Sequence, residues 1–139
     1  MHDASPVAGD DPLKAHKELV SQFIQAFYNE KDFERAKSLL TEDFANHHPG
    51  VGKGRDRTIT TFREQAATPF PQFSLTVRRM VAEGAYVWTH SLAKVDPEAT
   101  GAVVVDIWRV QDGLLAEKWD VGQPVPEDST ADEMMSDHR

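Results

Sequence analysis

The dipeptide Asp112-Gly113 lies between two runs of β-branched and aromatic residues, and this arrangement strongly constrains the fold. The runs are GAVVVDIWRVQ at 101–111 and LLAEKWDVGQPVP at 114–126. Asp-Gly favours a two-residue type I′ turn, because both central residues of that turn need positive φ. Valine, isoleucine and tryptophan favour the pleated surface of a sheet. The segment therefore predicts a β-hairpin at the centre of an antiparallel sheet.

Asp106 is out of place in this hairpin, because it lies between a run of three valines and Ile107-Trp108. An ionised carboxylate loses much of its hydration in such surroundings, at a large cost in free energy. The residue therefore needs a charged partner, a raised pKa or a cavity to point into. We take it as the leading candidate for a functional residue.

Strand register suggests a partner for Asp106. If the preceding connection is centred near Glu98, His90 lies opposite Asp106 on the neighbouring strand. A two-residue turn at Asp112-Gly113 places Trp119 opposite Asp106 on the other side. The three residues would then form one row on one face of the sheet, unless a single-residue bulge turns one of them to the other face.

An Asp–His pair on an apolar sheet suits proton transfer, because burial and a neighbouring charge can bring a pKa close to neutral pH. The alternative is a buried ion pair that only fixes the strand register. In this register Trp88 and Trp108 share the face of Asp106, as cavity wall or core. Lys118 and Asp120 lie on the opposite face, which we expect to be partly solvated or to form a dimer surface.

The rest of the chain predicts three helices and three further strands. Asp11-Pro12 is a helix start, with Asp as N-cap and Pro at the first helical position. The predicted helices cover 11–28, a shorter segment after Asp32, and 55–66; the predicted strands cover 44–48, 73–82 and 86–95. Helical spacing directs Phe27 and Phe62 inward. This order predicts an α+β fold, a curved antiparallel sheet wrapped around a long N-terminal helix with two further helices.

His47-His48 is a second candidate for chemistry. Adjacent strand residues point to opposite faces, so one of the two can enter a pocket, and the sequence does not say which. Two adjacent histidines do not make a metal site, and the chain has no His-x-x-x-His motif, so we expect no metal and no other cofactor. The glycine-rich segment 51–56 lacks the Gly-Lys-Ser/Thr ending of a phosphate-binding loop.

Composition excludes several classes of protein. The net charge of −8 is concentrated in the ends, and no basic stripe predicts nucleic-acid binding. The chain has no cysteine, no apolar run long enough to span a membrane, and no secretory signal, so we expect a cytoplasmic protein. We divide it into a disordered tail (1–10), one domain (11–126) and an acidic flexible tail (127–139).

Two segments carry a resemblance to a known family: FIQAFYNEKDFERAKSLLTEDFANHHPG at 23–50 and VVVDIWRVQDGLLAEKWDVGQPVP at 103–126. The chain resembles the NTF2-like superfamily and, within it, the SnoaL-like polyketide cyclases and the predicted aldol-condensation proteins. The resemblance implies a cone-shaped fold with a deep apolar pocket, often dimeric through the outer sheet face. SnoaL-like cyclases close a polyketide ring by intramolecular aldol condensation without metal or cofactor.

The resemblance implies a small cofactor-independent enzyme that acts on a hydrophobic carbonyl compound by aldol-type cyclisation or enolisation. Its catalytic candidates are Asp106 for proton transfer, His90 to orient it, and His47 or His48 from the opposite wall. Its pocket candidates are Trp88, Trp108, Trp119, Phe27 and Phe62.

Several alternatives to this function remain open. One is a non-catalytic ligand-binding or dimerisation module. Others are a dehydratase and an epoxide hydrolase; the latter needs a second acid and an arginine inside, and Arg109 points away from Asp106 by alternation. Many SnoaL-like cyclases carry an acidic residue a few positions beyond the aromatic residue of their last strand. In this chain that position falls near Asp120 or Gln123, after Trp119, and either residue could take its place. Ketosteroid isomerase belongs to the same superfamily and carries a tyrosine on its helix, which falls near Ile24 in this chain. Plain ketosteroid isomerisation is therefore not expected.

Overall fold

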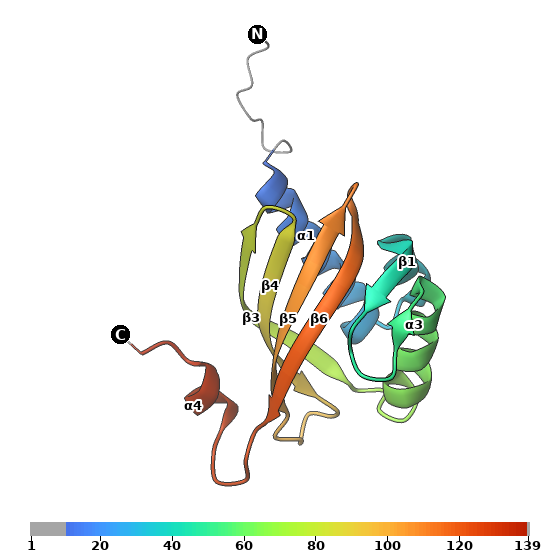
Figure 1. The fold of residues 1–139 in the computed structure, drawn as a ribbon. Coiled ribbons are helices and arrows are strands. Elements are labelled where there is room, and N and C mark those ends of the chain that lie inside the picture. Colours follow the sequence, from blue (N-terminus) through green and yellow to red (C-terminus); the bar gives the residue numbers. More distant parts are fainter. Residues whose placement is uncertain (1–10, 139) are drawn as a thin grey trace.

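The computed structural model describes residues 11–138, and the predicted tail 1–10 lies outside the described residues. A six-stranded sheet forms the body of the protein, with the strand order β2-β1-β6-β5-β4-β3 (Figure 1). All neighbouring strands are antiparallel except β1 and β6, which are parallel. The strands are β1 Leu40–Asn46, β2 Gly52–Lys53, β3 Ser74–Glu83, β4 Tyr86–Lys94, β5 Ala102–Gln111 and β6 Leu114–Pro124.

Helices cover one face of this sheet, the inner face (Figure 1). They are α1 Pro12–Ile24, which continues into the π-helical turn η2 Gln25–Asn29; α2 Phe33–Ser38; and α3 Arg55–Phe62, which continues into the π-helical turn η3 Arg63–Ala67. Asp11 caps α1 as predicted, because its carboxylate accepts hydrogen bonds from the backbone N–H groups of Leu13 and Lys14. The predicted α+β fold, with a sheet around a long N-terminal helix, is confirmed.

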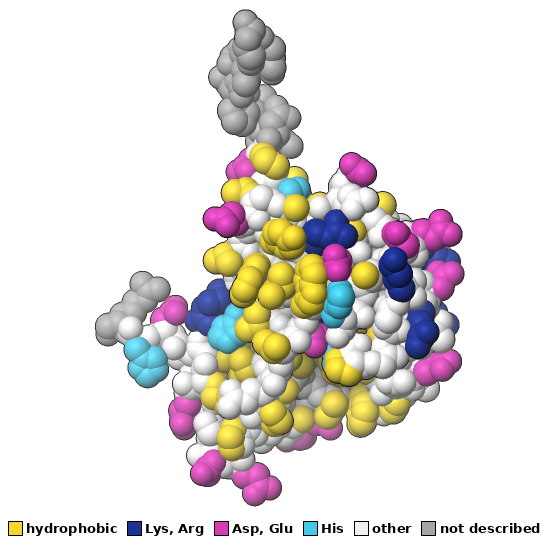
Figure 2. All heavy atoms as spheres, viewed as in Figure 1, with side chains coloured by type: hydrophobic (Ala, Val, Ile, Leu, Met, Phe, Trp, Pro, Cys, Tyr) yellow, Lys and Arg dark blue, Asp and Glu magenta, His cyan; other side chains and the backbone are white. Residues whose placement is uncertain are grey.

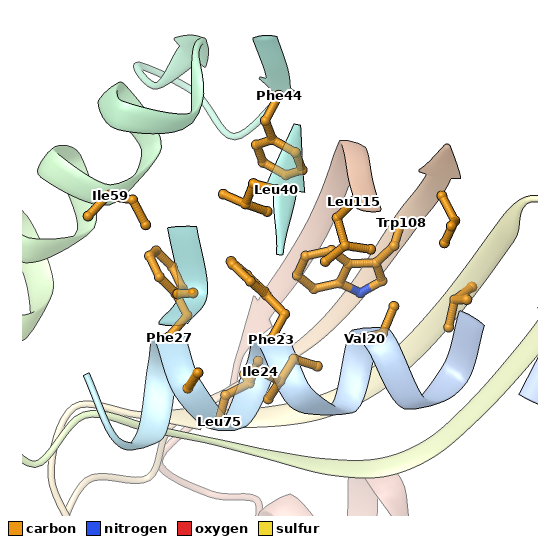
Figure 3. Packing of buried hydrophobic residues seen from close by; sticks show 14 residues of the cluster. Val20, Phe23, Ile24, Phe27, Leu40, Phe44, Ile59, Leu75, Trp108 and Leu115 are labelled. Carbon is orange, nitrogen blue, oxygen red and sulfur yellow. The ribbon is translucent and has the colours of Figure 1, made fainter. Parts of the chain in front are cut away.

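The core lies between α1 and the inner face of the sheet, and aromatic rings fill much of it (Figure 3). The Phe23 ring stacks on Phe27 at 4.8 Å between centroids and meets Trp108 edge-on at 5.5 Å. Trp108 is fully buried, and its indole N–H donates to the Thr89 hydroxyl at 3.1 Å. The predicted inward direction of Phe27 is therefore confirmed.

The hairpin turn is confirmed, but the predicted register beyond it is wrong by one residue. Asp112 and Gly113 both have positive φ, and Gln111 pairs with Leu114 as a two-residue turn requires. A bulge follows, because Val110 pairs with Leu115 whereas Arg109 pairs with Glu117, leaving Ala116 as an extra residue. Asp106 consequently lies opposite Asp120 and not opposite Trp119.

The predicted pairing of His90 with Asp106 is also wrong. Thr89 lies opposite Asp106, and His90 lies opposite Val105 on the outer face of the sheet. The connection between β4 and β5 is centred half a residue earlier than Glu98, which is enough to invert the faces. His90 contacts Arg79 there, and burial together with the Arg79 charge lowers the pKa of His90.

The register shifts between β4 and β5 and between β5 and β6 invert the faces that we had predicted for the side chains of β4 and β6. Trp119 lies opposite Ile107 on the outer face, and Trp88 pairs with Ile107 from the other side. Lys118 and Asp120 lie on the inner face with Asp106, where we had expected Trp119, whereas Trp108 shares the face of Asp106 as predicted. The prediction of a partly solvated face or a dimer surface for Lys118 and Asp120 is therefore wrong.

A short helix, α4 Ala131–Met135, follows β6, although the sequence predicts a flexible tail from residue 127. Met135 is buried, and Arg79 donates to its carbonyl oxygen at 2.7 Å and to the Asp137 carboxylate at 3.1 Å. Arg78 also donates to the Ser136 hydroxyl at 3.0 Å, so one apolar side chain and two arginines hold this segment against the sheet. The limits of the domain itself stay a prediction. Within residues 11–138, no helix is both long and apolar enough to cross a membrane.

Replacing Phe23 with alanine should lower the free energy of unfolding by about 3–5 kcal/mol, because a fully buried ring leaves a cavity between α1 and Trp108. Phe70→Ala is the matched control; its ring is 41% exposed, and the loss should stay below about 1 kcal/mol. Urea unfolding followed by circular dichroism measures both. Equal losses for the two variants would contradict the described core.

Candidate functional site

A cavity of about 280 Å³ opens between the helices and the inner face of the sheet. Its apolar wall consists of Phe27 and Phe62 from the helical side, Phe73 and Leu75 from the start of β3, and Ala93 and Val104 from the sheet. Its polar wall includes Tyr28, Asn46, His48, Asp106, Lys118 and Asp120. A largely apolar cleft with a few convergent polar groups is the usual form of a small-molecule site.

Lys118 lies between two carboxylates at the polar wall. Its Nζ is 3.2 Å from Oδ1 of Asp106 and 2.7 Å from Oδ2 of Asp120, and the Lys118 and Asp106 side chains are almost fully buried. The bulge at Ala116 is the reason for this arrangement, because it turns Lys118 and Asp120 inward, opposite the strand that carries Asp106. The buried Asp106 thus has its charged partner on the neighbouring strand.

His48 extends this chain of contacts to the surface. Its Nδ1 is 3.0 Å from Oδ2 of Asp120, and its side chain is 57% exposed at the edge of the cavity. His47 points the other way, as alternation requires. Its Nε2 is 2.7 Å from Glu117, and its ring stacks on Trp119 at 5.0 Å. Of the two histidines, His48 is the one that faces the cavity.

Tyr28 enters the cavity from η2 and is hydrogen-bonded to Lys118. Burial, with smaller effects of the nearby carboxylates, raises the pKa of Tyr28 to about 12, so the phenol keeps its proton at neutral pH. An ammonium can only donate, so the phenol oxygen accepts from Lys118 and the phenol O–H is free to donate elsewhere.

Asn29 holds the end of η2 in place beside this tyrosine. Its side-chain amide donates to the Leu75 carbonyl at 3.0 Å and accepts from the Leu75 N–H at 2.8 Å. The side-chain amide therefore pairs with the backbone at the start of β3, as the backbone of a neighbouring strand would. Since Leu75 also lines the cavity, this clamp links two of its walls.

The two carboxylates have opposite pKa shifts. Burial raises the pKa of Asp106, and the nearby Lys118 only partly offsets this effect. Burial also acts on Asp120, but Lys118 and the hydrogen bond from His48 outweigh it, so the pKa of Asp120 is lowered. Burial acts to lower the pKa of Lys118, but the Tyr28 oxygen and the carboxylates of Asp106 and Asp120 together outweigh it, so the pKa of Lys118 is raised.

A pair of titratable groups whose surroundings separate their pKa values is the usual basis for assigning an acid and a base. Asp106 is suited to holding a proton and Asp120 to remaining ionised. Because its pKa is raised, Lys118 stays protonated, and an ammonium is a poor nucleophile for forming a Schiff base. The arrangement can therefore donate and accept protons across a small apolar space.

The structure brings together only part of the predicted site. Asp106, His48, Phe27 and Phe62 line the cavity. Trp108 lies in the core next to it, with Lys118 Nζ 5.7 Å from the centre of its ring. The side chains that lie on the outer face, away from the cavity, are His47, His90, Trp88 and Trp119.

Sequence reasoning did not assign Tyr28 or Lys118 to the site and left the role of Asp120 open. One signal was present in the sequence: Leu114-Leu115-Ala116 is an apolar run without alternation, which is compatible with a bulge. A shift of one residue there pairs Lys118 with two acids. Within the part of the chain that the structure describes, no three His, Cys, Asp or Glu side chains are grouped as a metal site would need.

The model of the SnoaL-like domain family matches residues 20–118. A candidate ketosteroid isomerase from Kribbella flavida has a similar structure, with 21% identity, a TM-score of 0.70 and 91% of each chain covered. IdmH, a candidate polyketide cyclase from Streptomyces antibioticus, has 21% identity and a TM-score of 0.67 over 78% of this chain and 91% of its own.

An LEH-like epoxide hydrolase from M. tuberculosis has 23% identity and a TM-score of 0.64 over 80% of this chain and 84% of its own. A comparison with curated proteins found no match. The predicted SnoaL-like family is confirmed, and the predicted NTF2-like fold is shared with the solved structures. At these identities, the solved structures show the shared fold and not a shared reaction.

The opposite pKa shifts predict opposite effects of pH on two variants. The raised pKa of Asp106 means that the folded state holds this proton more tightly than the unfolded chain. Its contribution to stability is therefore complete below the usual value of 3.8 and is lost as pH rises through the raised value. Relative to wild type, the free energy of unfolding of Asp106→Asn should increase as pH rises from the usual value of 3.8 through the raised pKa of Asp106.

Asp120→Asn is the matched control. The lowered pKa of Asp120 stabilises the fold above the usual value of 3.8, and this contribution is lost as pH falls through the lowered value. Relative to wild type, this variant should therefore lose stability as pH rises from the lowered value to about 3.8, and the difference should stay constant above that pH. Urea unfolding at a series of pH values measures both trends, and trends of the same sign would contradict the assignment.

Proposed function

We propose that this chain, which belongs to the SnoaL-like domain family, is an enzyme that enolises a small apolar carbonyl compound or cyclises it by an aldol-type reaction. The reaction uses acid–base groups of the protein and no cofactor. One observation carries the proposal: Asp106 and Asp120, with opposite pKa shifts, flank Lys118 in the wall of an otherwise apolar cavity.

The carbonyl oxygen of the substrate lies at the Asp106 end of the polar wall. Protonated Asp106 and the neutral Tyr28 phenol can donate hydrogen bonds to it, and the Lys118 ammonium supplies positive charge nearby. Donors that are already in place where negative charge develops stabilise an enolate without reorganisation. A cavity that excludes water strengthens each of these interactions.

His48 acts as the general base. Asp120 accepts a hydrogen bond from its Nδ1, so the lone pair of a neutral imidazole is on Nε2. A carboxylate that holds a histidine in one tautomer and stabilises the imidazolium is the usual arrangement of a histidine base. The exposed edge of His48 also lets it exchange protons with solvent.

In the reaction, His48 Nε2 removes a proton from the carbon next to the carbonyl. The electron pair of that C–H bond forms a C=C bond, and the π electrons of the carbonyl move to its oxygen, which receives a hydrogen bond from Asp106. In a cyclisation, the enolate carbon then attacks a second carbonyl of the same molecule, the carbonyl of the first group re-forms, and the new alkoxide takes the proton from the His48 imidazolium. In a simple enolisation, the His48 imidazolium returns this proton, or one exchanged with solvent, to carbon.

The contacts of Asp106 favour this proposal over a purely structural pair or a binding module without chemistry. A binding module predicts an Asp106 satisfied by backbone donors, with no open space beside it. Asp106 instead lines the cavity, and its partner is the Lys118 side chain, 3.2 Å away.

Epoxide hydrolysis is a second candidate, supported by a second acid and a cation inside the cavity. Asp106 would protonate the epoxide oxygen, while His48 and Asp120 would activate a water that attacks carbon and opens the C–O bond. We had expected this chemistry to need an inward arginine, and Lys118 occupies that place. Incubation with cyclohexene oxide in ¹⁸O-labelled water distinguishes epoxide hydrolysis from enolisation, because only an epoxide hydrolase converts this compound to a labelled diol.

Enolisation can be measured without the natural substrate, as exchange of the α-protons of 1-tetralone in deuterium oxide. We expect wild type to accelerate this exchange, and Asp106→Asn and His48→Asn each to lower the enzymatic rate by about 100-fold or more. Proton NMR of the ketone gives the rate directly.

His47→Asn is the matched control, because it removes the adjacent histidine from the outer face and should change the rate by less than about twofold. Circular dichroism verifies that each variant is folded. A folded Asp106→Asn protein with the full wild-type rate would rule out the proposed role of this residue.

We also propose that two copies associate through the outer face of the sheet. Figure 2 shows hydrophobic side chains gathered on this face, where Val81, Trp88 and Val121 are 63%, 48% and 70% exposed. Such a patch is more typical of an interface than of a free surface, and a self-complementary patch favours a symmetric dimer.

Light scattering should therefore give twice the chain mass of 15.6 kDa, and Trp88→Asp should give the monomer mass. Phe70→Asp, a charge placed on an exposed ring outside the sheet, is the control and should remain dimeric. A monomeric wild type at concentrations of about 100 µM would exclude the dimer.

A further inference from the structure

Helix α3 and the π-helical turn η3 present a polar stripe to the cavity. Thr58, Thr61 and Gln65 follow one another at spacings of three and four residues, which places them on one side of the helix, and all three line the cavity. Packing does not require polar residues there, because Ile59 supplies the contact of α3 with the hydrophobic core (Figure 3). The stripe is therefore a candidate for recognition of whatever molecule fills the cavity.

Two of these three side chains have hydrogen-bonding groups that the protein leaves unused. The Thr58 hydroxyl is buried and accepts a hydrogen bond from the Asn46 amide at 3.5 Å. Within residues 11–138, neither the Thr61 hydroxyl nor the Gln65 side-chain amide has a hydrogen-bond partner. Thr61 is half-buried and Gln65 is exposed, and both line the cavity, so a ligand can reach both.

The backbone of this segment gives a second reason to assign it to ligand binding. Single π-helical turns are rare and are often found at functional sites. The two such turns in the described part of the chain both contribute to the cavity wall: η2 through Phe27 and Tyr28, and η3 through Gln65 and Ala66. The irregular turn of η3 thus lies where the ligand would be, as that of η2 does.

Exposure orders the polar groups of the cavity by depth. Asp106 and Lys118 are almost fully buried and mark the closed end, whereas His48 and Gln65 are exposed and mark the mouth. A ligand whose carbonyl reaches Asp106 therefore extends past the half-buried Thr61 toward Gln65. The stripe is in the right place to bind the outer end of such a molecule.

We propose that Thr61 and Gln65 form a second binding subsite, which takes an uncharged hydroxyl group at the end of the substrate away from the reacting carbonyl. A threonine hydroxyl and a glutamine amide can each donate and accept, and an alcohol can pair with both. Lys118 is the sole lysine or arginine among the described residues that line the cavity, and it is paired with Asp106 and Asp120, so a carboxylate at this end would have no counter-charge. The inference rests on the proposed function for the position of the carbonyl.

The test uses two ketones of equal size, 6-(hydroxymethyl)-1-tetralone and 6-ethyl-1-tetralone, which carry their substituent on the far side of the ring from the carbonyl. NMR titration of the full chain gives the ratio of the two dissociation constants, ethyl over hydroxymethyl. This ratio should be about fivefold lower in Thr61→Val and in Gln65→Met than in wild type, because each change replaces one hydrogen-bonding group with an apolar group of similar size.

Thr60→Val and Glu64→Met are the matched controls, since they make the same kinds of change at exposed neighbours that do not line the cavity. Both should keep the wild-type ratio. An unchanged ratio in either Thr61→Val or Gln65→Met overturns the two-residue subsite, and so do an equal fall in the controls and a wild type that binds neither ketone.

The failure of this inference and that of the proposed function can be told apart, because binding is measured without turnover. A ratio that falls as expected, in a protein that does not exchange the α-protons of 1-tetralone, would refute the proposed function and support the subsite. Rapid exchange of 1-tetralone together with an unchanged ratio would refute the subsite alone.

Discussion

The ammonium of Lys118 is the charge around which the cavity is built. Asp106 is buried among apolar side chains and is paired with this lysine. Asp120 and Tyr28 also contact Lys118, and His48 is hydrogen-bonded to Asp120. Burying one charge alone is prohibitive, and burying a pair requires good geometry and further hydrogen bonds. The network meets this condition with two carboxylates and a phenol around one cation. Each member is therefore held in place by the others, which is what a preorganised site needs.

Removing a single member has unequal effects, because the charges do not balance in the same way around each residue. Without Lys118, two carboxylates would face each other in an apolar wall. Without Asp106, one cation and one anion remain, and the pair Lys118–Asp120 at 2.7 Å is still complete. The site therefore separates into a structural pair, Lys118 with Asp120, and a residue, Asp106, whose protonation can change. This division agrees with the acid role proposed for Asp106.

Local features of the fold could be predicted from the sequence, because short-range physics determines them. The Asp11 cap, the Asp112-Gly113 turn and the inward direction of Phe27 each depend on a few neighbouring residues. The faces of the strands could not be predicted in the same way. Alternation has a period of two, so an offset of one residue in a connection or a bulge inverts every side chain beyond it. For that reason Asp106 was identified correctly as buried, while His90 was placed beside it in error.

The inward position of Lys118 was the least predictable part of the site, because a buried lysine is rare and depends on partners from another strand. The extra residue Ala116 decides this position, since it shifts the pairing of β6 while leaving the turn and the paired core residues Val110 and Leu115 in place. If the strand paired regularly through Ala116, without the bulge, Glu117 and Trp119 would lie on the inner face and Lys118 and Asp120 on the outer face. In evolutionary terms, a single codon inserted after Glu117 would likewise turn Lys118 and Asp120 outward, and would replace the chemistry of the cavity and the character of the outer surface together. Relatives with the same fold can thus differ in reaction through a change in length that point substitutions alone would need many steps to reach.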